Sequence, residues 1–257
     1  MTAIRRVLVF CPMYQLYDAT LKSIFELRWD GPLYRLFSND NPYNDAANSY
    51  FRAVGHQNNI QLNMQRARRT CLEQGFDALL TIEADVIAPP DALQKLAEVD
   101  ADVVYGLYVW RRFAAPMWSA YCDVTPRGGH SVSVLGAQAM RDSWGHVIDC
   151  VGVGFGCTLI HRHVLEKVDF HTGDWRDTDF PDHHFSLDCQ RGMFVQKCHT
   201  GVRCGHIDGN NHRILWPAPD GYSTQPLVHM KNYGLRPASD EHPSLMGQCN
   251  RLLRTIL

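Results

Sequence analysis

The sequence has no apolar run that approaches the roughly 20 residues needed for a membrane-spanning helix. Residues 1–6 lead directly into a strand-like apolar segment, without the apolar region of a signal peptide. There is no long run of Lys or Arg, and the formal net charge is -2. The composition therefore does not favour a nucleic-acid partner, although it does not exclude one. Together these absences predict a cytoplasmic protein without a membrane span.

The sequence also has no Cys-x-x-Cys pair. Its nine cysteines are an odd number and are scattered through apolar segments, which suits a reducing compartment better than a disulfide framework. Cys198, His199, Cys204 and His206 lie close together in the sequence and leave a structural zinc site as an alternative. Without a second pair of closely spaced ligands, the zinc signal is weak.

The chain is long enough to bury a full hydrophobic core. With 257 residues and 45% apolar content it predicts one domain, or one domain with a small appendage. Apolar strand-like segments at residues 6–10, 33–38 and 103–108 alternate with helical patterns at residues 17–27 and 59–74. This alternation is typical of an α/β fold with a mostly parallel sheet.

Residues 78–86 contain the strongest functional signal. An apolar run of strand length ends there in two carboxylates, Glu83 and Asp85, with Ala84 between them. Alternation along a strand would place both carboxylates on one face. Such a pair can hold Mg²⁺ or Mn²⁺, since Mg²⁺ typically takes one or two protein carboxylates and leaves its other positions to phosphate oxygens and water. A helix that begins near Pro89-Pro90 would complete the unit.

Residues 66–111 resemble the centre of a nucleotide-sugar glycosyltransferase of the GT-A fold, similar to family 2, in which this strand ends in an Asp-x-Asp motif. Here Glu83 replaces the first Asp. The resemblance implies a three-layer α/β/α sandwich with a mostly parallel central sheet and a small β-rich acceptor-side insertion. It implies a catalytic domain over residues 1–208, with a nucleotide-binding half (1–110) and an acceptor-side half (111–208). Residues 209–257 are expected to be a loop-rich extension packing on the same domain.

The resemblance also implies nucleotide contacts outside the acidic motif. Pro12 and Tyr14 match a turn that contacts the nucleotide, and Asp40 matches an acidic residue that binds the base. Arg66 is a candidate partner for the diphosphate, because a guanidinium fits phosphate oxygens. Ordinary structural roles remain open for all of these residues: a turn proline, a packing tyrosine, an Asx turn and a solvated helix face.

Three further segments follow the order of the family. Gly154 and Gly156 match a glycine-rich segment beside the donor sugar, although such glycines are also simply a permissive strand entry. Asp182 matches the general base at a helix start, where the dipole favours a carboxylate, with a capping Asp as the alternative. His206 matches a histidine that completes the metal site with Asp85 and Glu83. Before these segments, Gly128-Gly129 separates two strand-like runs, at residues 118–124 and 131–135, that predict a hairpin.

The resulting hypothesis is transfer of a sugar from a nucleoside diphosphate sugar, preferably a UDP-sugar, to an acceptor hydroxyl. The reaction is expected to depend on Mn²⁺ or Mg²⁺ and to invert the anomeric centre. The acceptor is open: a saccharide, a small molecule, or a hydroxylated base in phage DNA. Alternatives are a sugar nucleotidyltransferase, a non-catalytic nucleotide- or sugar-binding module, and a zinc-stabilised module. The nucleotidyltransferase is disfavoured because residues 11–18 lack its Gly-rich, basic first loop.

Overall fold

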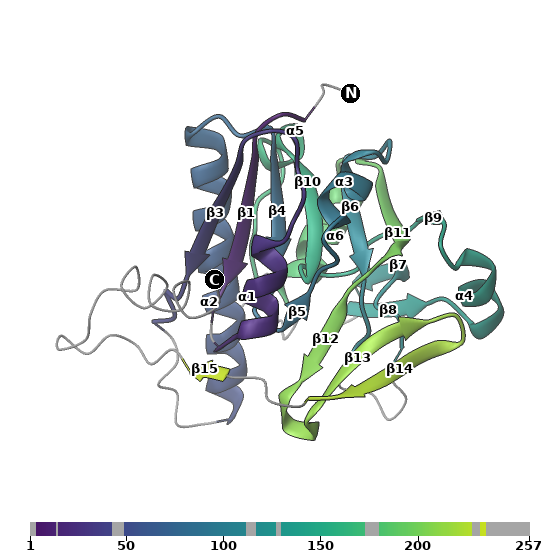
Figure 1. Ribbon diagram of the computed structural model, residues 1–257. Helices are drawn as coiled ribbons and strands as arrows, with labels where there is room; N and C mark the ends of the chain where they lie inside the picture. The colour runs from purple at the N-terminus through teal and green to yellow at the C-terminus, as the bar shows by residue number, and fades with distance from the viewer. Residues whose placement is uncertain are drawn as a thin grey trace.

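The computed structural model describes residues 4–13, 15–42, 49–111, 117–126, 130–172, 180–227 and 232–234. A seven-stranded sheet crosses the molecule in the order β3-β1-β4-β10-β6-β11-β9 (Figure 1). Its strands are β3 (Leu33–Ser38), β1 (Val7–Pro12), β4 (Ala78–Ile82), β10 (Cys157–His161), β6 (Val103–Leu107), β11 (Gln196–Arg203) and β9 (Val147–Asp149).

The sheet is mostly parallel, as the sequence predicted. β1 runs parallel to β3 and β4, and β11 runs parallel to β6. Only β10 and β9 run against their neighbours. Every residue of β4, β6 and β10 is buried, which explains why β4 and β6 are mainly apolar along their length rather than alternating.

Helices cover both faces of the sheet and make an α/β fold of three layers (Figure 1). α2 and α6 lie on one face, and α1 and α3 lie on the other. The helices are α1 (Asp18–Phe25), α2 (Ser49–Glu73), α3 (Ala92–Ala97), α4 (Ala137–Ser143), α5 (Arg162–Leu165) and α6 (Pro181–Arg191). No helix in the described ranges is long and apolar enough to cross a membrane.

A second sheet of four strands stands below the carboxyl ends of the parallel strands, in the order β14-β13-β12-β5. Its strands are β14 (Gly221–Pro226), β13 (Arg213–Ala218), β12 (Gly205–Asp208) and β5 (Val86–Ile87). The sequence predicted loops after residue 208, but residues 213–226 form a hairpin that extends β12. Loops were expected because Pro217 and Pro219 resemble turn residues; Pro217 is nevertheless accommodated within β13.

Two small β elements complete the described chain. β7 (Tyr121–Pro126) and β8 (His130–Val134) pair antiparallel, which confirms the predicted hairpin. β15 (Asn232–Gly234) pairs with β2 (Gln15–Tyr17), so the chain returns beside its first loop. A short 3-10 turn (Gly209–Asn211) joins β12 to β13. The predicted helix near the C-terminus, over residues 245–257, lies outside the described residues.

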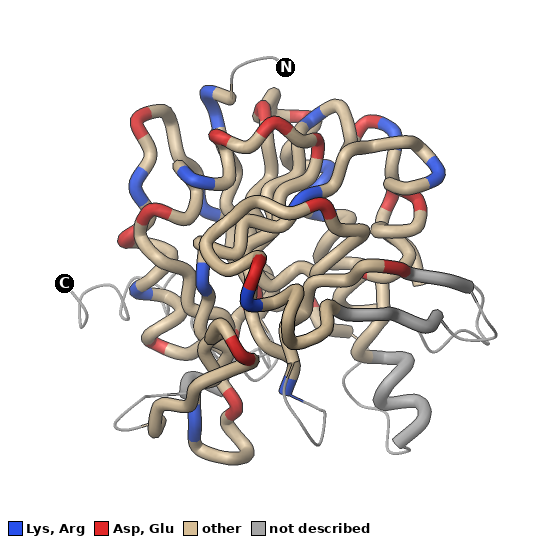
Figure 2. The backbone as a smooth tube through the Cα atoms, turned by 90° about the vertical axis from the view of Figure 1, so that its right-hand side faces the viewer, with Lys and Arg blue, Asp and Glu red and all other residues tan. Residues whose placement is uncertain are grey.

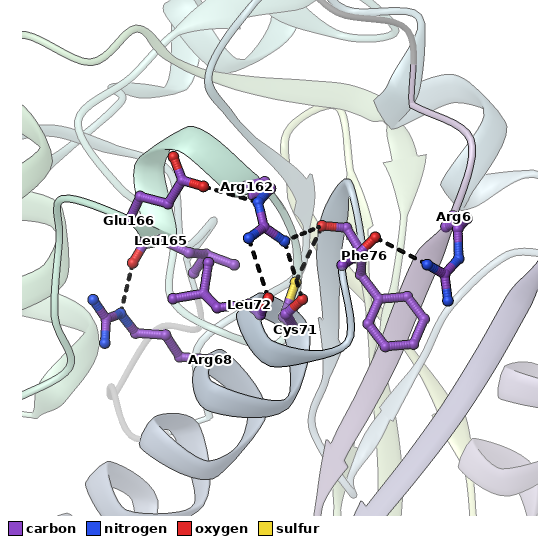
Figure 3. A network of polar contacts seen from close by, with 9 residues as sticks. Arg6, Arg68, Cys71, Leu72, Phe76, Arg162, Leu165 and Glu166 are labelled. Atoms are coloured by element: carbon purple, nitrogen blue, oxygen red, sulfur yellow. Dashed lines mark hydrogen bonds and ion pairs between the residues drawn. The ribbon is translucent and has the colours of Figure 1, made fainter.

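One hydrophobic core runs through residues of both predicted halves, from Val7 to Leu215. Two arginines stabilise it at the C-terminal end of α2, where helix carbonyls lack intrahelical partners (Figure 3). Arg162 donates to the carbonyls of Cys71, Leu72 and Phe76 at 3.1–3.4 Å. Arg6 donates to the carbonyls that follow, those of Gln74 and Gly75.

We expect Arg162→Ala to lower the free energy of unfolding by about 1–3 kcal/mol, because it removes the charged hydrogen bonds from Arg162 to the carbonyls of Cys71, Leu72 and Phe76. Urea unfolding would measure the change. Arg141→Ala is the matched control, since Arg141 bonds only to Gln138 on the exposed face of α4, where effects within about 0.5 kcal/mol are usual. Equal losses in the two variants would contradict the capping role.

Candidate active site at the carboxyl edge of the sheet

Glu83 and Asp85 lie in a tight turn, not on a continuing strand. β4 ends at Ile82, the Glu83 N–H donates to the Gly156 carbonyl at 3.2 Å, and the Val86 N–H donates to the Glu83 carbonyl at 3.0 Å. The sequence predicted one strand through Val86, so the argument from strand alternation is wrong. A turn places the two carboxylates where the parallel sheet ends, which is the usual location of binding sites in α/β folds.

β12 brings His206 next to Asp85. His206 pairs with Val86 in the second sheet, and the Ile207 N–H donates to the Asp85 carbonyl at 2.8 Å. The His206 Nε2 atom lies 3.8 Å from Asp85 Oδ1. Two residues separated by more than a hundred positions therefore face each other across a single strand pairing.

The contacts of His206 define its protonation. Its Nδ1 atom lies 2.6 Å from the Val109 carbonyl, which can only accept, so Nδ1 carries the proton and Nε2 presents a lone pair. Burial lowers the pKa of His206 to about 4, so the ring is neutral at physiological pH. Nε2 is buried and has no hydrogen-bond partner among the described residues. A neutral imidazole nitrogen that faces a carboxylate oxygen is a fitting ligand for a cation.

Arg111 occupies the other oxygen of Asp85. Its Nη1 atom lies 2.5 Å from Asp85 Oδ2 and 2.7 Å from the Ile207 carbonyl. Burial acts to raise the pKa of Asp85, but the charge and hydrogen bond of Arg111, together with the effects of His206 and a backbone hydrogen bond, hold the pKa below its ordinary value. Asp85 is therefore ionised, with Oδ2 paired and Oδ1 directed to the side of His206.

Glu83 is in a different state from Asp85. Burial, together with the nearby carboxylates of Asp85 and Asp182, raises its pKa to about 8, although the charge of Arg111 acts in the opposite direction. The Glu83 carboxyl group is therefore mostly protonated at neutral pH. One acid of the pair is thus ionised and the other neutral, a division typical of carboxylates that share a site.

Asp182 approaches the same edge from the start of α6. The helix begins at Pro181 and has Phe180 as its N-cap, so Asp182 lies in the first turn and is not the capping residue. Its Oδ1 atom accepts the His183 N–H at 3.1 Å. The charge of Asp182 is one of the causes that raise the pKa of Glu83.

The glycine-rich segment allows this approach. Gly154 has φ +110°, and a Cβ atom there would lie 2.2 Å from the Tyr108 hydroxyl oxygen and 3.0 Å from Asp182 Oδ2. A Cβ atom on Gly156 would lie 2.6 Å from the Tyr108 ring. Both glycines are therefore required for packing against Tyr108, whose hydroxyl donates to the Val153 carbonyl at 3.0 Å. Their predicted contact with a donor sugar remains a prediction.

An aromatic wall lies beside Asp182. The rings of Trp110 and Tyr121 have centroids 5.1 Å apart, and those of Tyr121 and His183 are 5.7 Å apart. Tyr121 is buried, while Trp110 and His183 are half-buried. Flat aromatic faces of this kind suit the apolar faces of sugar rings or bases.

No described hydrogen bond or ion pair joins the predicted nucleotide-contact residues to these carboxylates. Pro12 ends β1 next to β4 and so lies at the same edge of the sheet. Asp40 is exposed after β3, and its carbonyl accepts from Asn63 at 2.9 Å. Arg66 is exposed on α2. Tyr14 lies outside the described residues.

A metal site at this edge has two protein ligands available. Asp85 Oδ1 and His206 Nε2 are 3.8 Å apart, within the span of one ion at the usual bond lengths of about 2.0–2.2 Å. No group of three or more His, Cys, Asp or Glu side chains in the described ranges is arranged to hold a metal. A bound cation would favour the ionised form of Glu83, the third predicted ligand, and phosphate and water oxygens would complete the coordination. The same finding weighs against the zinc alternative.

Arg111 is the main residue of the site that sequence reasoning missed. The available signal was its place shortly after the buried parallel strand β6, which ends at Leu107. We call Glu83, Asp85, Arg111, Asp182 and His206 the carboxyl-edge site.

Comparison with known proteins gives information on the fold of this chain but not on its function. No family model matches this sequence, and no curated protein matches it. Among solved structures, the crystal structure of A197 from STIV is similar with a TM-score of 0.52 and 17% sequence identity. The match covers 92% of this chain and 100% of that chain. The chain therefore shares a mixed α/β architecture with A197 over nearly its whole length.

The raised pKa of Glu83 gives a pH-dependent prediction. The folded state holds its proton up to about pH 8, whereas an unperturbed Glu loses it near 4.5. The folded state therefore binds more protons than the unfolded state in this window, and stability falls as pH rises through it. Glu83→Gln mimics the protonated acid, so we expect its stability relative to wild type to increase over the same window.

Thermal or urea unfolding of both proteins across this pH range would measure the difference, with the exposed Glu98→Gln as control. His206 contributes a slope of opposite sign only below about pH 6.5, because its pKa is lowered to about 4. A stability difference between Glu83→Gln and wild type that does not change with pH would contradict the protonated state of Glu83.

Proposed function

We propose that this protein is a glycosyltransferase that uses a nucleoside diphosphate sugar, preferably a UDP-sugar, and that the carboxyl-edge site is its active site. The observation that carries the proposal is the pairing of ionised Asp85 with the unpartnered Nε2 of His206, close to Asp182. This arrangement suits a hard cation and a diphosphate leaving group beside a carboxylate base. The GT-A arrangement of the sheet is part of the proposal.

Each residue of the carboxyl-edge site has a separate role in the proposed reaction. Asp85 and His206 would hold Mn²⁺ or Mg²⁺, which when bound supplies positive charge to the departing diphosphate. Asp182 takes the proton of the acceptor hydroxyl as that oxygen attacks the anomeric carbon. The bond to the diphosphate breaks on the opposite face, so the anomeric centre inverts.

The aromatic wall supports an acceptor with a flat ring. The rings of Trp110, Tyr121 and His183 form this wall, and His183 follows Asp182 at the start of α6. A saccharide acceptor matches this wall through its apolar ring face. A hydroxylated base would match it by stacking, but it would also need a basic surface for the nucleic-acid backbone. Acidic and basic residues are interspersed over the face drawn in Figure 2, which favours the saccharide.

The test is the thermal stability of the purified protein with nucleoside diphosphates and their sugars, with and without Mn²⁺. A ligand at about 100 times its dissociation constant adds roughly 2.7 kcal/mol. We expect one nucleotide class to stabilise the protein only when the metal is present, and the matching donor sugar to be hydrolysed slowly. If no nucleotide stabilises the protein and no donor releases nucleoside diphosphate, the proposal is wrong. Stabilisation without hydrolysis or transfer would indicate the binding-module alternative.

A further inference from the structure

The two oxygen atoms of the Asp85 carboxylate have partners of different kinds. Oδ2 is paired with the Arg111 guanidinium, while Oδ1 faces the lone pair of His206 Nε2 at 3.8 Å. Two electron-rich atoms that face each other in a buried place are unfavourable without a cation between them. A cation bound there leaves the Arg111 contact intact, because it uses the other carboxylate oxygen.

Arg111 has binding capacity left after these contacts. It uses Nη1 for both Asp85 and the Ile207 carbonyl, and its Nε and Nη2 atoms make no hydrogen bond within the described ranges. About a third of its side chain, 32%, is exposed. An arginine has a planar fork of five donors that matches phosphate oxygens in pairs. Because Nη1 is bonded to Asp85 and to the Ile207 carbonyl, the guanidinium is fixed at the edge of the site while Nε and Nη2 remain able to donate.

The charges of the site are unbalanced in a way that suits a diphosphate. Asp208, the next carboxylate along β12, is paired with Arg213 at 3.0 Å and with Asn211 at 2.7 Å. Asp85 would then contact both the guanidinium and a divalent cation. Two cations on one carboxylate leave positive charge beside it, which a ligand with two phosphates would balance.

We propose that Arg111 is a second, permanent cation of the diphosphate site, which binds the phosphates directly and makes metal binding depend on the nucleotide. This inference rests on the proposed function and states how the positive charge at the diphosphate site is shared between Arg111 and the metal. Two opposite effects follow. Arg111 strengthens the binding of diphosphate, and it weakens the binding of a divalent cation alone, because like charges repel across Asp85.

The test compares wild type with Arg111→Gln and Arg111→Lys, using Mn²⁺ alone and inorganic pyrophosphate alone as probes. Electron paramagnetic resonance of free Mn²⁺ and titration calorimetry would measure the two affinities. For Arg111→Gln we expect Mn²⁺ to bind at least about tenfold more tightly and pyrophosphate at least about tenfold more weakly. Arg111→Lys keeps the charge, so we expect Mn²⁺ affinity within about twofold of wild type and weaker pyrophosphate binding, since lysine lacks the planar fork.

A merely structural role of Arg111 predicts a different pattern, with both affinities falling together as the site loosens. That result, or no change in either affinity, would overturn the inference. If Arg111→Gln does not fold, the pyrophosphate affinity of Arg111→Lys decides, and an unchanged value overturns it. The proposed function fails separately if wild type binds no Mn²⁺ even with pyrophosphate present, or if Asp85→Asn leaves that binding unchanged.

Discussion

Asp182→Asn should reduce sugar transfer by roughly 10²-fold or more and leave donor binding intact. The amide has the same shape as the carboxylate and can still accept the His183 N–H, so the start of α6 is preserved. It cannot take a proton from the acceptor hydroxyl. Initial rates with the donor found by the stability screen, together with the thermal shift caused by that donor, would separate the two effects.

Asp188→Asn is the matched control on the same helix. Asp188 accepts from Arg191 at 2.9 Å and contacts His171 at 2.7 Å, two side chains outside the carboxyl-edge site. A small change in stability and a near-normal turnover are expected there. Near-normal turnover in Asp182→Asn would exclude Asp182 as the base. It would instead favour a retaining reaction that uses no protein base.

Asp85→Asn should weaken Mn²⁺ binding in the presence of the nucleotide by about 10²-fold or more. Loss of a residue that only supports a metal ligand typically costs about 10–100-fold in affinity, and loss of a charged ligand should cost at least as much. The variant also leaves Arg111 without its carboxylate partner. We expect the metal-dependent stabilisation by nucleotide to disappear and turnover to fall with it.

Asp91→Asn provides the control for this change. Asp91 forms a surface ion pair with Lys95 at 2.8 Å, and both side chains are exposed. Such a pair contributes at most about 1 kcal/mol, so metal binding should not change. If Asp85→Asn retains full metal affinity, the cation is not held at the carboxyl-edge site, and the acidic turn after β4 has a structural role.

The class of the fold could be predicted from the sequence because the relevant signals are local. Fully apolar segments such as residues 78–82 and 103–107 are typical of buried parallel strands, and both are found in the central sheet. The position of Asp182 in the first turn of a helix was also predictable, since Pro181 is favoured at that place. The hairpin around Gly128-Gly129 followed from turn chemistry in the same way.

The strands around the acidic pair were harder to predict. The sequence pattern favours two strands at residues 194–198 and 201–206, whereas β11 runs from Gln196 to Arg203 and the chain then enters a different sheet as β12. The stop of β4 at Ile82 was likewise missed, because Val86 and Ile87 continue the apolar pattern although they pair with β12. Strand boundaries depend on the partner strand, which the local pattern does not contain.

The sequence by itself determined which residues carry chemistry: two acids after a buried strand, an acid at a helix start and a histidine in a later strand. Only the tertiary structure decided their states. Asp85 is ionised because Arg111 lies against it, Glu83 is protonated because burial and two neighbouring carboxylates disfavour its charge, and His206 is neutral because it is buried. Protonation depends on distance and burial, and both arise only when β5 pairs with β12 and α6 packs against the glycine-rich segment.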